Sequence, residues 1–162
     1  MKFRIGLGVD AHRLAPGRKL VLGGIDIPYG RGLVGHSDGD VLLHALTDAI
    51  LGAVGAPDLG SMFPSSDERW REAASRSFVE KGLQIVEEKG YQLAQVDTVI
   101  VAEEPPLAPY FHAIREALAA LLRVPAEAVG VKAKTFDGMG FTGRGEGILA
   151  QAIVLLESKE TP

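Results

Sequence analysis

The chain has 162 residues, of which 46% are hydrophobic and 23% charged, a size and composition typical of one globular domain. It contains no cysteine, which excludes disulfides, iron–sulfur clusters and thiolate zinc sites, so any metal must be held by imidazole and carboxylate groups. A net charge of -4 lacks the basic excess of a nucleic-acid-binding protein, so we expect no nucleic-acid partner.

The N-terminal segment, Met1 to Arg13, alternates apolar residues with Gly, Asp and His and lacks the basic start and apolar block of a secretion signal. No apolar run reaches the roughly 18 residues that are needed to cross a bilayer. We therefore expect a soluble, cytoplasmic protein without a membrane partner. We expect one catalytic domain over residues 1–157 and a C-terminal tail over 158–162.

Apolar residues alternate with polar residues and glycines at the start of the chain. This alternation predicts a half-buried strand with one apolar face, formed by Phe3, Ile5, Leu7 and Val9. Asp10 and His12 then lie on the opposite face of that strand. The following segment, 15–35, is rich in glycine and proline, which predicts loops around one short strand, Leu20 to Leu22.

Two helices are predicted in the next third of the chain. An apolar run from Asp40 to Val54 predicts a buried helix that carries His44, with Ser37 and Asp38 as candidates for its N-cap. Large apolar residues at helical spacing then predict a second helix from about Glu68 to Lys89.

The last third of the chain mixes strands with one more helix. A strand is predicted at 96–102 and an amphipathic helix around 114–121, which ends before Pro125. Two final strands, 129–135 and 148–157, are joined by a glycine-rich segment and predict a terminal hairpin. This order favours an α+β fold, a single domain with a mixed or antiparallel sheet packed by helices, over a doubly wound sheet.

Three of the four histidines, His12, His36 and His44, lie within the first 44 residues and near acidic residues. Residues i and i+2 of a strand point the same way, so Asp10 and His12 can reach one metal ion, and His44 could join them from the next helix. Two histidines and one carboxylate would leave a coordination position open for a substrate. The alternative is that Asp10 caps a turn and that each histidine has its own hydrogen-bond partners.

Asp48 lies four residues after His44 on the same predicted helix. Such a carboxylate can orient the imidazole of a metal ligand, and it can equally make an ordinary helix contact.

The segment 138–147 has five glycines in ten residues. Its backbone could approach an anion closely, and Arg144 could add a bidentate contact, but a wide hairpin turn has the same composition. The residues just before the segment offer cationic, hydroxyl and carboxylate groups to a phosphate and a second metal: Lys132, Lys134, Thr135 and Asp137.

Together, three ordered motifs resemble the 2-C-methyl-D-erythritol 2,4-cyclodiphosphate synthase family. They are Asp10-Ala11-His12, the run from His36 to Asp48, and the run from Gly140 to Gly147. Shorter pieces agree in order, namely Asp58 to Gly60, Phe63 to Asp67 and Ala102 to Ala108. The resemblance spans almost the whole chain.

The resemblance implies a lyase of the non-mevalonate isoprenoid pathway. Such an enzyme converts 4-diphosphocytidyl-2-C-methyl-D-erythritol 2-phosphate into a cyclic diphosphate and releases CMP. It also implies a homotrimer of α+β subunits with active sites between neighbouring subunits.

On this resemblance, Asp10, His12 and His44 would bind zinc or a similar divalent ion, and Asp137 would hold a second metal, magnesium or manganese. His36 and Thr135 would be catalytic and stabilise charge in the transition state. Substrate contacts are implied for Asp10, His12, His36, Ser37, Asp58, Gly60, Phe63, Asp67, Ala102, Pro105, Leu107, Ala108, Lys134, Thr135, Asp137, Phe141 and Arg144. The chain departs from the family pattern at three positions, where the family commonly has Thr for Lys134, Glu for Asp137 and Lys for Pro106.

Two other functions are compatible with the same residues. A metal-dependent phosphoesterase would use the three metal ligands to activate water. A binding module for prenyl or nucleotide diphosphates would use the apolar residues beside Arg144 without catalysis.

Overall fold

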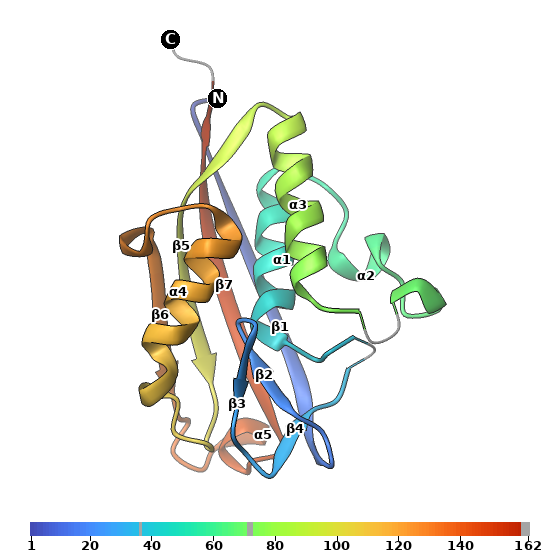
Figure 1. The fold of residues 1–162 in the computed structure, drawn as a ribbon, viewed down its shortest axis with the longest axis vertical. Coiled ribbons are helices and arrows are strands. Elements are labelled where there is room, and N and C mark those ends of the chain that lie inside the picture. Colours follow the sequence, from blue (N-terminus) through green and yellow to red (C-terminus); the bar gives the residue numbers. More distant parts are fainter. Residues whose placement is uncertain (36, 71–72, 160–162) are drawn as a thin grey trace.

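A mixed sheet, with three long central strands, forms the frame of the molecule (Figure 1). The computed structural model describes residues 1–35, 37–70 and 73–159. The strand order is β4-β1-β7-β5-β6, and only the β5–β6 pair is parallel. These strands are β1 Phe3–Pro16, β4 Arg31–Leu33, β5 Tyr91–Val101, β6 Val129–Lys134 and β7 Gly147–Ser158. A separate small hairpin pairs β2 Leu20–Leu22 with β3 Ile25–Ile27.

The longer helices lie on one face of this sheet (Figure 1). The described residues form the α-helices α1 Val41–Ala53, α2 Leu59–Met62, α3 Arg76–Glu88, α4 Phe111–Leu122 and α5 Gly140–Gly143. They also form three short 3-10 helices, Glu68–Trp70, Ala108–Tyr110 and Ala126–Ala128. The predicted α+β domain with a mixed sheet is confirmed. Among the described residues, no helix has both the length and the apolar character needed to span a membrane.

The predicted terminal hairpin is wrong. β6 does not pair with β7. It lies at the edge of the sheet and pairs in parallel with β5, after the crossover through α4. β7 lies between β1 and β5 and is antiparallel to both along most of its length. The long β7 thereby gains two long partners, whereas β6 has six residues and could cover only half of it.

The predicted helix from Glu68 to Lys89 is shorter in the structure. A 3-10 turn, Glu68–Trp70, comes first, and α3 begins only at Arg76. Trp70 therefore lies before the helix and packs beside Phe78, with ring centroids 5.8 Å apart. Residues 71–72 lie outside the described part of the chain.

The N-cap of α1 also differs from the prediction. Asp40, not Ser37 or Asp38, caps the helix, and its carboxylate accepts from the backbone N–H of Leu43 at 3.0 Å. The same carboxylate accepts from the N–H groups of Gly23 and Gly24 and so ties the β2–β3 turn to the helix. Burial raises the pKa of Asp40 to about 6, although these three donors lower it.

β1 is half-buried, as predicted, but its buried face is not the apolar one. Gly6 and Gly8 face α1. A Cβ atom on Gly6 would lie 1.8 Å from the carbonyl oxygen of Ala49, and one on Gly8 would lie 1.9 Å from the carbonyl oxygen of Ala45. No side chain fits in that space, so the two glycines let the helix backbone rest directly on the strand. This close approach brings α1 alongside Asp10 and His12, which follow on the same face of the strand.

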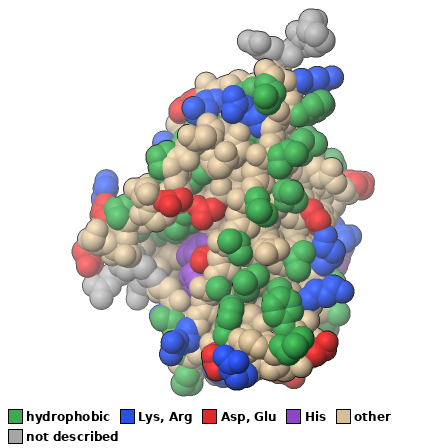
Figure 2. All heavy atoms as spheres, turned by 180° about the vertical axis from the view of Figure 1, so that it is seen from behind, with side chains coloured by type: hydrophobic (Ala, Val, Ile, Leu, Met, Phe, Trp, Pro, Cys, Tyr) green, Lys and Arg blue, Asp and Glu red, His purple; other side chains and the backbone are tan. Residues whose placement is uncertain are grey.

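The apolar face of β1 is open. Ile5 and Leu7 are each 68% exposed, and Ile153 on the neighbouring strand is 43% exposed. Figure 2 shows hydrophobic side chains spread along this face, and at one side of it a hollow in which histidine side chains are visible. A run of exposed β-branched and leucine side chains on a sheet is typical of a surface that another chain covers.

We predict that Gly8→Ala destabilises the fold, since the new methyl group meets the backbone of Ala45 rather than a flexible side chain. The expected loss is roughly 1 to 3 kcal/mol or more, the range for overpacked sites. Urea unfolding measures it. Gly52→Ala is the control, because Gly52 lies on α1, the helix that carries Ala45, and a Cβ atom added there would have no neighbour within 4 Å. That change should stabilise the helix by up to about 1 kcal/mol. Equal effects from both variants would contradict the role of Gly8.

Candidate active site

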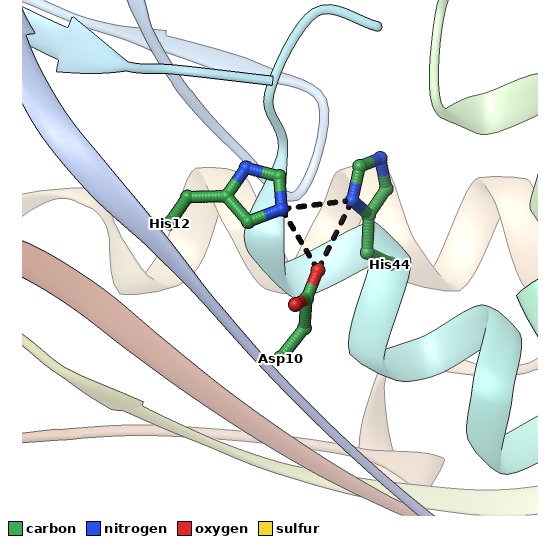
Figure 3. Close-up of side chains that lie close together, drawn as sticks. All are labelled: Asp10, His12 and His44. Carbon is green, nitrogen blue, oxygen red and sulfur yellow. Dashed lines mark hydrogen bonds and ion pairs between the residues drawn. The ribbon is translucent and has the colours of Figure 1, made fainter. Parts of the chain in front are cut away.

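Three side chains converge where α1 rests on β1 (Figure 3). The Nε2 atom of His12 lies 2.9 Å from Oδ2 of Asp10, and Nδ1 of His44 lies 3.1 Å from the same oxygen. The two imidazole nitrogens are 3.2 Å apart. Asp10 and His12 come from one face of β1 and His44 from the first turn of α1, as the sequence pattern predicts.

This triad fits a divalent cation. A zinc ion held at about 2.0 Å in tetrahedral geometry would set its ligand atoms about 3.3 Å apart, close to the separations in the triad. Without a proton or a cation between them, the lone pairs of two imidazoles and a carboxylate at such short range repel one another. The predicted ligands Asp10, His12 and His44 are thus a group that could hold a metal ion.

The protonation of Asp10 suits this role. Burial raises the pKa of Asp10, but the side chains of His12 and His44 beside its carboxylate lower it by more, so that the pKa lies well below its usual range. Asp10 is therefore a carboxylate across the physiological pH range. Metal ligation requires that form.

The outer nitrogen of His44 is oriented by hydroxyl groups and not by Asp48. Its Nε2 atom lies 2.9 Å from Oγ of Ser37 and 2.9 Å from Oγ of Ser75. Asp48 instead accepts from the backbone N–H of Leu59 at 2.7 Å and so holds the start of α2. Of the two roles considered for Asp48, the structure shows the ordinary structural contact.

The triad opens into a cavity of 520 Å³, a size that suits a small phosphorylated ligand. The cavity brings together seven of the residues predicted as ligand or metal contacts: Asp10, His12, Ser37, His44, Asp58, Gly60 and Phe63. Asp67, which was predicted with them, does not line it and is paired with Arg69 at 2.6 Å. His36 lies outside the described residues.

Aromatic side chains form one wall of this cavity. Phe63 lies 4.7 Å from Phe78 and 5.0 Å from Trp70, measured between ring centroids, and all three line the cavity. The ring of Phe78 also lies 6.0 Å from that of His44. The sequence does not reveal this role of Trp70 and Phe78, because helical spacing alone cannot tell a core stripe from the wall of a pocket.

The residues predicted for the nucleotide lie elsewhere on the chain. One set follows β5 and consists of Ala102, Pro105, Leu107 and Ala108. The other set lies at or after the end of β6 and consists of Lys134, Thr135 and Asp137. None of these residues lines the cavity of the triad. Asp10 is level with Ala150 of β7, which is level with Ile100 of β5. The triad and this second group therefore lie at the same end of the sheet. From β1, the strand β5 is two strand spacings or about 10 Å away, and β6 is three spacings or about 14 Å away.

The glycine-rich segment folds back onto β1. Phe141 and Gly147 line a cavity of 410 Å³ together with His12, on the side next to Arg13 and Arg31. Arg144 is exposed and paired with Glu146 at 2.7 Å. The segment is thus not the turn of a hairpin, since it links the edge strand β6 to the central strand β7.

Ser75 is a further residue of the site that the sequence did not reveal. It is fully buried and bonded to His44, although 31 residues separate the two. A serine before a helix ordinarily signals a cap, and no periodic pattern connects it to a distant histidine.

Comparisons with known proteins find one family. The YgbB family model matches residues 3–157. A relative from Moorella thermoacetica, named 2-C-methyl-D-erythritol 2,4-cyclodiphosphate synthase, is 57% identical over 157 residues, which are 97% of this chain and 96% of that protein. A relative of the same name from Shouchella clausii is 50% identical and covers 97% of this chain and 99% of its own.

Solved structures give the same result. A structure of 2C-methyl-D-erythritol-2,4-cyclodiphosphate synthase matches with a TM-score of 0.89 and 43% identity, covering 95% of this chain and 100% of its own. A Plasmodium falciparum IspF in complex with CDP matches with a TM-score of 0.87 and 30% identity, covering 98% of both chains.

We predict that His44→Ala abolishes stoichiometric zinc binding and leaves the fold intact, because the variant removes one of three ligands from a site that the helix and strand still frame. Isothermal titration with zinc and circular dichroism measure the two properties. His112→Ala is the control, since His112 is exposed on α4 and is not part of the triad. A folded His44→Ala variant that still binds zinc stoichiometrically would mean that the histidine is not a ligand.

Proposed function

The chain belongs to the YgbB family, and from this premise we propose that it acts as a 2-C-methyl-D-erythritol 2,4-cyclodiphosphate synthase of non-mevalonate isoprenoid biosynthesis. The observation that carries the proposal is the Asp10, His12 and His44 triad, which opens into a cavity of 520 Å³. Relatives at 50% to 57% identity over nearly the whole chain bear the same name.

The reaction is a cyclisation of 4-diphosphocytidyl-2-C-methyl-D-erythritol 2-phosphate. An oxygen of the 2-phosphate attacks the β-phosphorus and forms a new phosphorus–oxygen bond. The bond from the β-phosphorus to the bridging oxygen breaks, and CMP leaves with that oxygen and the electron pair. We class the enzyme as a phosphorus–oxygen lyase. Because both reacting groups belong to one molecule, the protein needs no nucleophile and contributes positioning and charge neutralisation.

The triad would hold the first metal ion, which we propose to be zinc. Such an ion supplies positive charge that neutralises and polarises a phosphate oxygen. Asp10 contributes its permanent carboxylate, and His12 and His44 contribute neutral nitrogens. This explains how a chain with a net charge of -4 accommodates a polyanion, since the neutralising charge is local and bound.

We assign the cavity of the triad to the methylerythritol end of the substrate. Asp58 and Gly60 stand at the start of α2, where a carboxylate and an unhindered backbone suit sugar hydroxyl groups. Phe63, with its aromatic neighbours, would exclude water from the reacting phosphates. We extend the same assignment to Ser37, which lines the cavity, and to Asp67, which does not.

The second group of residues would take the nucleotide and the second metal. We assign Ala102, Pro105, Leu107, Ala108 and Lys134 to the cytidine end of the substrate. We propose that Asp137, together with the diphosphate, binds magnesium or manganese. Thr135, whose hydroxyl lies 3.3 Å from Oδ1 of Asp137, would stabilise charge in the transition state, as would His36. Phe141 and Arg144 complete the proposed contacts.

We propose that the enzyme is a homotrimer with active sites between subunits. Two observations support this. The open face of the sheet carries exposed apolar residues such as Ile5 and Leu7. The triad and the proposed nucleotide residues do not share a cavity within one chain, so a site between chains can unite the triad of one subunit with the nucleotide residues of its neighbour.

We predict that removal of divalent metal abolishes CMP release and that added zinc with magnesium or manganese restores it. Purified protein is treated with a chelator and incubated with the cytidyl substrate, and phosphorus NMR identifies the products. The cyclic diphosphate is the expected product. Linear methylerythritol phosphates would instead indicate a phosphoesterase, binding without turnover would indicate a binding module, and full activity of the metal-free protein would refute the metal-dependent scheme.

We predict that Leu7→Glu converts the trimer into monomers, since the new charge stands in the middle of the open apolar face. Light scattering after size-exclusion chromatography measures the mass. Zinc binding should persist, because one chain supplies all three ligands, whereas CMP release should fall at least tenfold. The control is Ala113→Glu, an equal change on the exposed side of α4. A trimer that survives Leu7→Glu would place the interface elsewhere.

A further inference from the structure

A chain of hydrogen bonds backs His44 on the side away from the proposed metal. Nε2 of His44 lies 2.9 Å from the hydroxyl oxygens of both Ser37 and Ser75, which are 3.2 Å from each other. The hydroxyl of Ser75 is in close contact with Oδ1 of Asp38, and the backbone N–H of Ser75 donates to Oδ2 of Asp38 at 3.0 Å. Ser75 is fully buried and does not line the cavity, and Ser37 and His44, which do line it, are each less than a tenth exposed.

One arrangement of protons satisfies the contacts of Ser75 with both Asp38 and His44. A carboxylate only accepts, so the hydroxyl of Ser75 donates its single proton to Asp38. The oxygen of Ser75 can then only accept from His44, which requires a proton on Nε2 of the imidazole. A neutral imidazole with its proton on Nε2 has a free lone pair on Nδ1, the atom that faces Asp10 and His12.

We propose that Ser75, oriented by Asp38, is a positioning residue that holds His44 in the tautomer whose Nδ1 atom can bind the metal. The inference rests on the metal-binding part of the proposed function and does not depend on which reaction follows. Neither residue touches the triad's shared centre, and both act through the ring of His44.

Ser37 alone cannot impose this tautomer. Its hydroxyl accepts a weak contact at 3.4 Å from the backbone N–H of Gly39 and can rotate either to accept from Nε2 or to donate to it. Asp38 removes that freedom from Ser75, because the carboxylate fixes the direction of the serine proton. The selection therefore depends on the pair Asp38 and Ser75.

The arrangement also fixes the position of the ring. Ser75 directly precedes α3, and Phe78 on the first turn of that helix packs near His44. α3 thus supports the imidazole from behind through one hydrogen bond and one aromatic contact. For His12 the structure shows no equivalent, since its buried Nδ1 atom has no hydrogen-bond partner among the described residues.

Two substitutions test the inference. Ser75→Ala removes the acceptor, so both tautomers of His44 become accessible and zinc affinity should fall roughly 10- to 100-fold, the usual range for loss of a group that orients a ligand. Asp38→Asn is the sharper variant, because its amide N–H can donate to the oxygen of Ser75 and free the serine proton for Nε2. That reversal should populate the tautomer with the proton on Nδ1.

The measurements are zinc affinity by competition with a chelator, and the tautomer of His44 by long-range proton–nitrogen NMR of zinc-free protein with labelled histidine. The spectra are taken at mildly alkaline pH, where imidazole is neutral. Ser77→Ala is the matched control, since its hydroxyl lies near the start of the same helix and donates to the carbonyl of Ala74 instead of to the triad. Thermal unfolding of each variant shows whether the fold is retained.

Three results together would support the inference. The wild-type protein carries the proton on Nε2, both variants show a mixed or reversed tautomer, and zinc binding is weakened only in those variants. A proton on Nδ1 in the wild type, or wild-type zinc affinity and tautomer in both variants, would overturn it. If wild-type protein binds no zinc, the proposed metal centre fails, but the tautomer measured without metal still decides the role of Ser75.

Discussion

The backbone contact between α1 and β1 determines where the chemistry of this protein can take place. Because Gly6 and Gly8 have no side chains, the carbonyl groups of Ala45 and Ala49 rest on the strand itself. His44 precedes Ala45 and therefore stands beside the next two inward positions of β1, which are Asp10 and His12. A larger residue at either glycine would separate the helix from the strand, and the three ligands would no longer converge.

The sequence predicted the triad better than it predicted the strand pairing around it. Strand and helix periodicities are local. The sequence around each residue therefore predicted that Asp10 and His12 share one face of a strand and that His44 lies on a helix. Strand partners are not local. β6 pairs with β5 after a crossover and not with β7, because pairing is decided by what the rest of the sheet offers.

Buried polar contacts were the least predictable part. Ser37 and Asp38 looked like helix caps, yet the cap is Asp40, and both of the other residues turn toward Ser75. The alternation of β1 correctly indicated a strand but not which face is buried, since glycine carries no hydrophobic signal and here forms the packed side. Patterns of apolar residues describe the core of one chain only when no other chain covers its surface.

The separation of the triad from the residues after β5 and β6 has a genetic consequence in the proposed trimer. A subunit that lacks the triad still carries its nucleotide residues, and a subunit that lacks those residues still carries its triad. Two inactive variants of this kind, produced in one cell, would form mixed trimers in which some interfaces unite the intact halves. Such pairs of defective alleles would complement each other, whereas two alleles damaged in the same half would not.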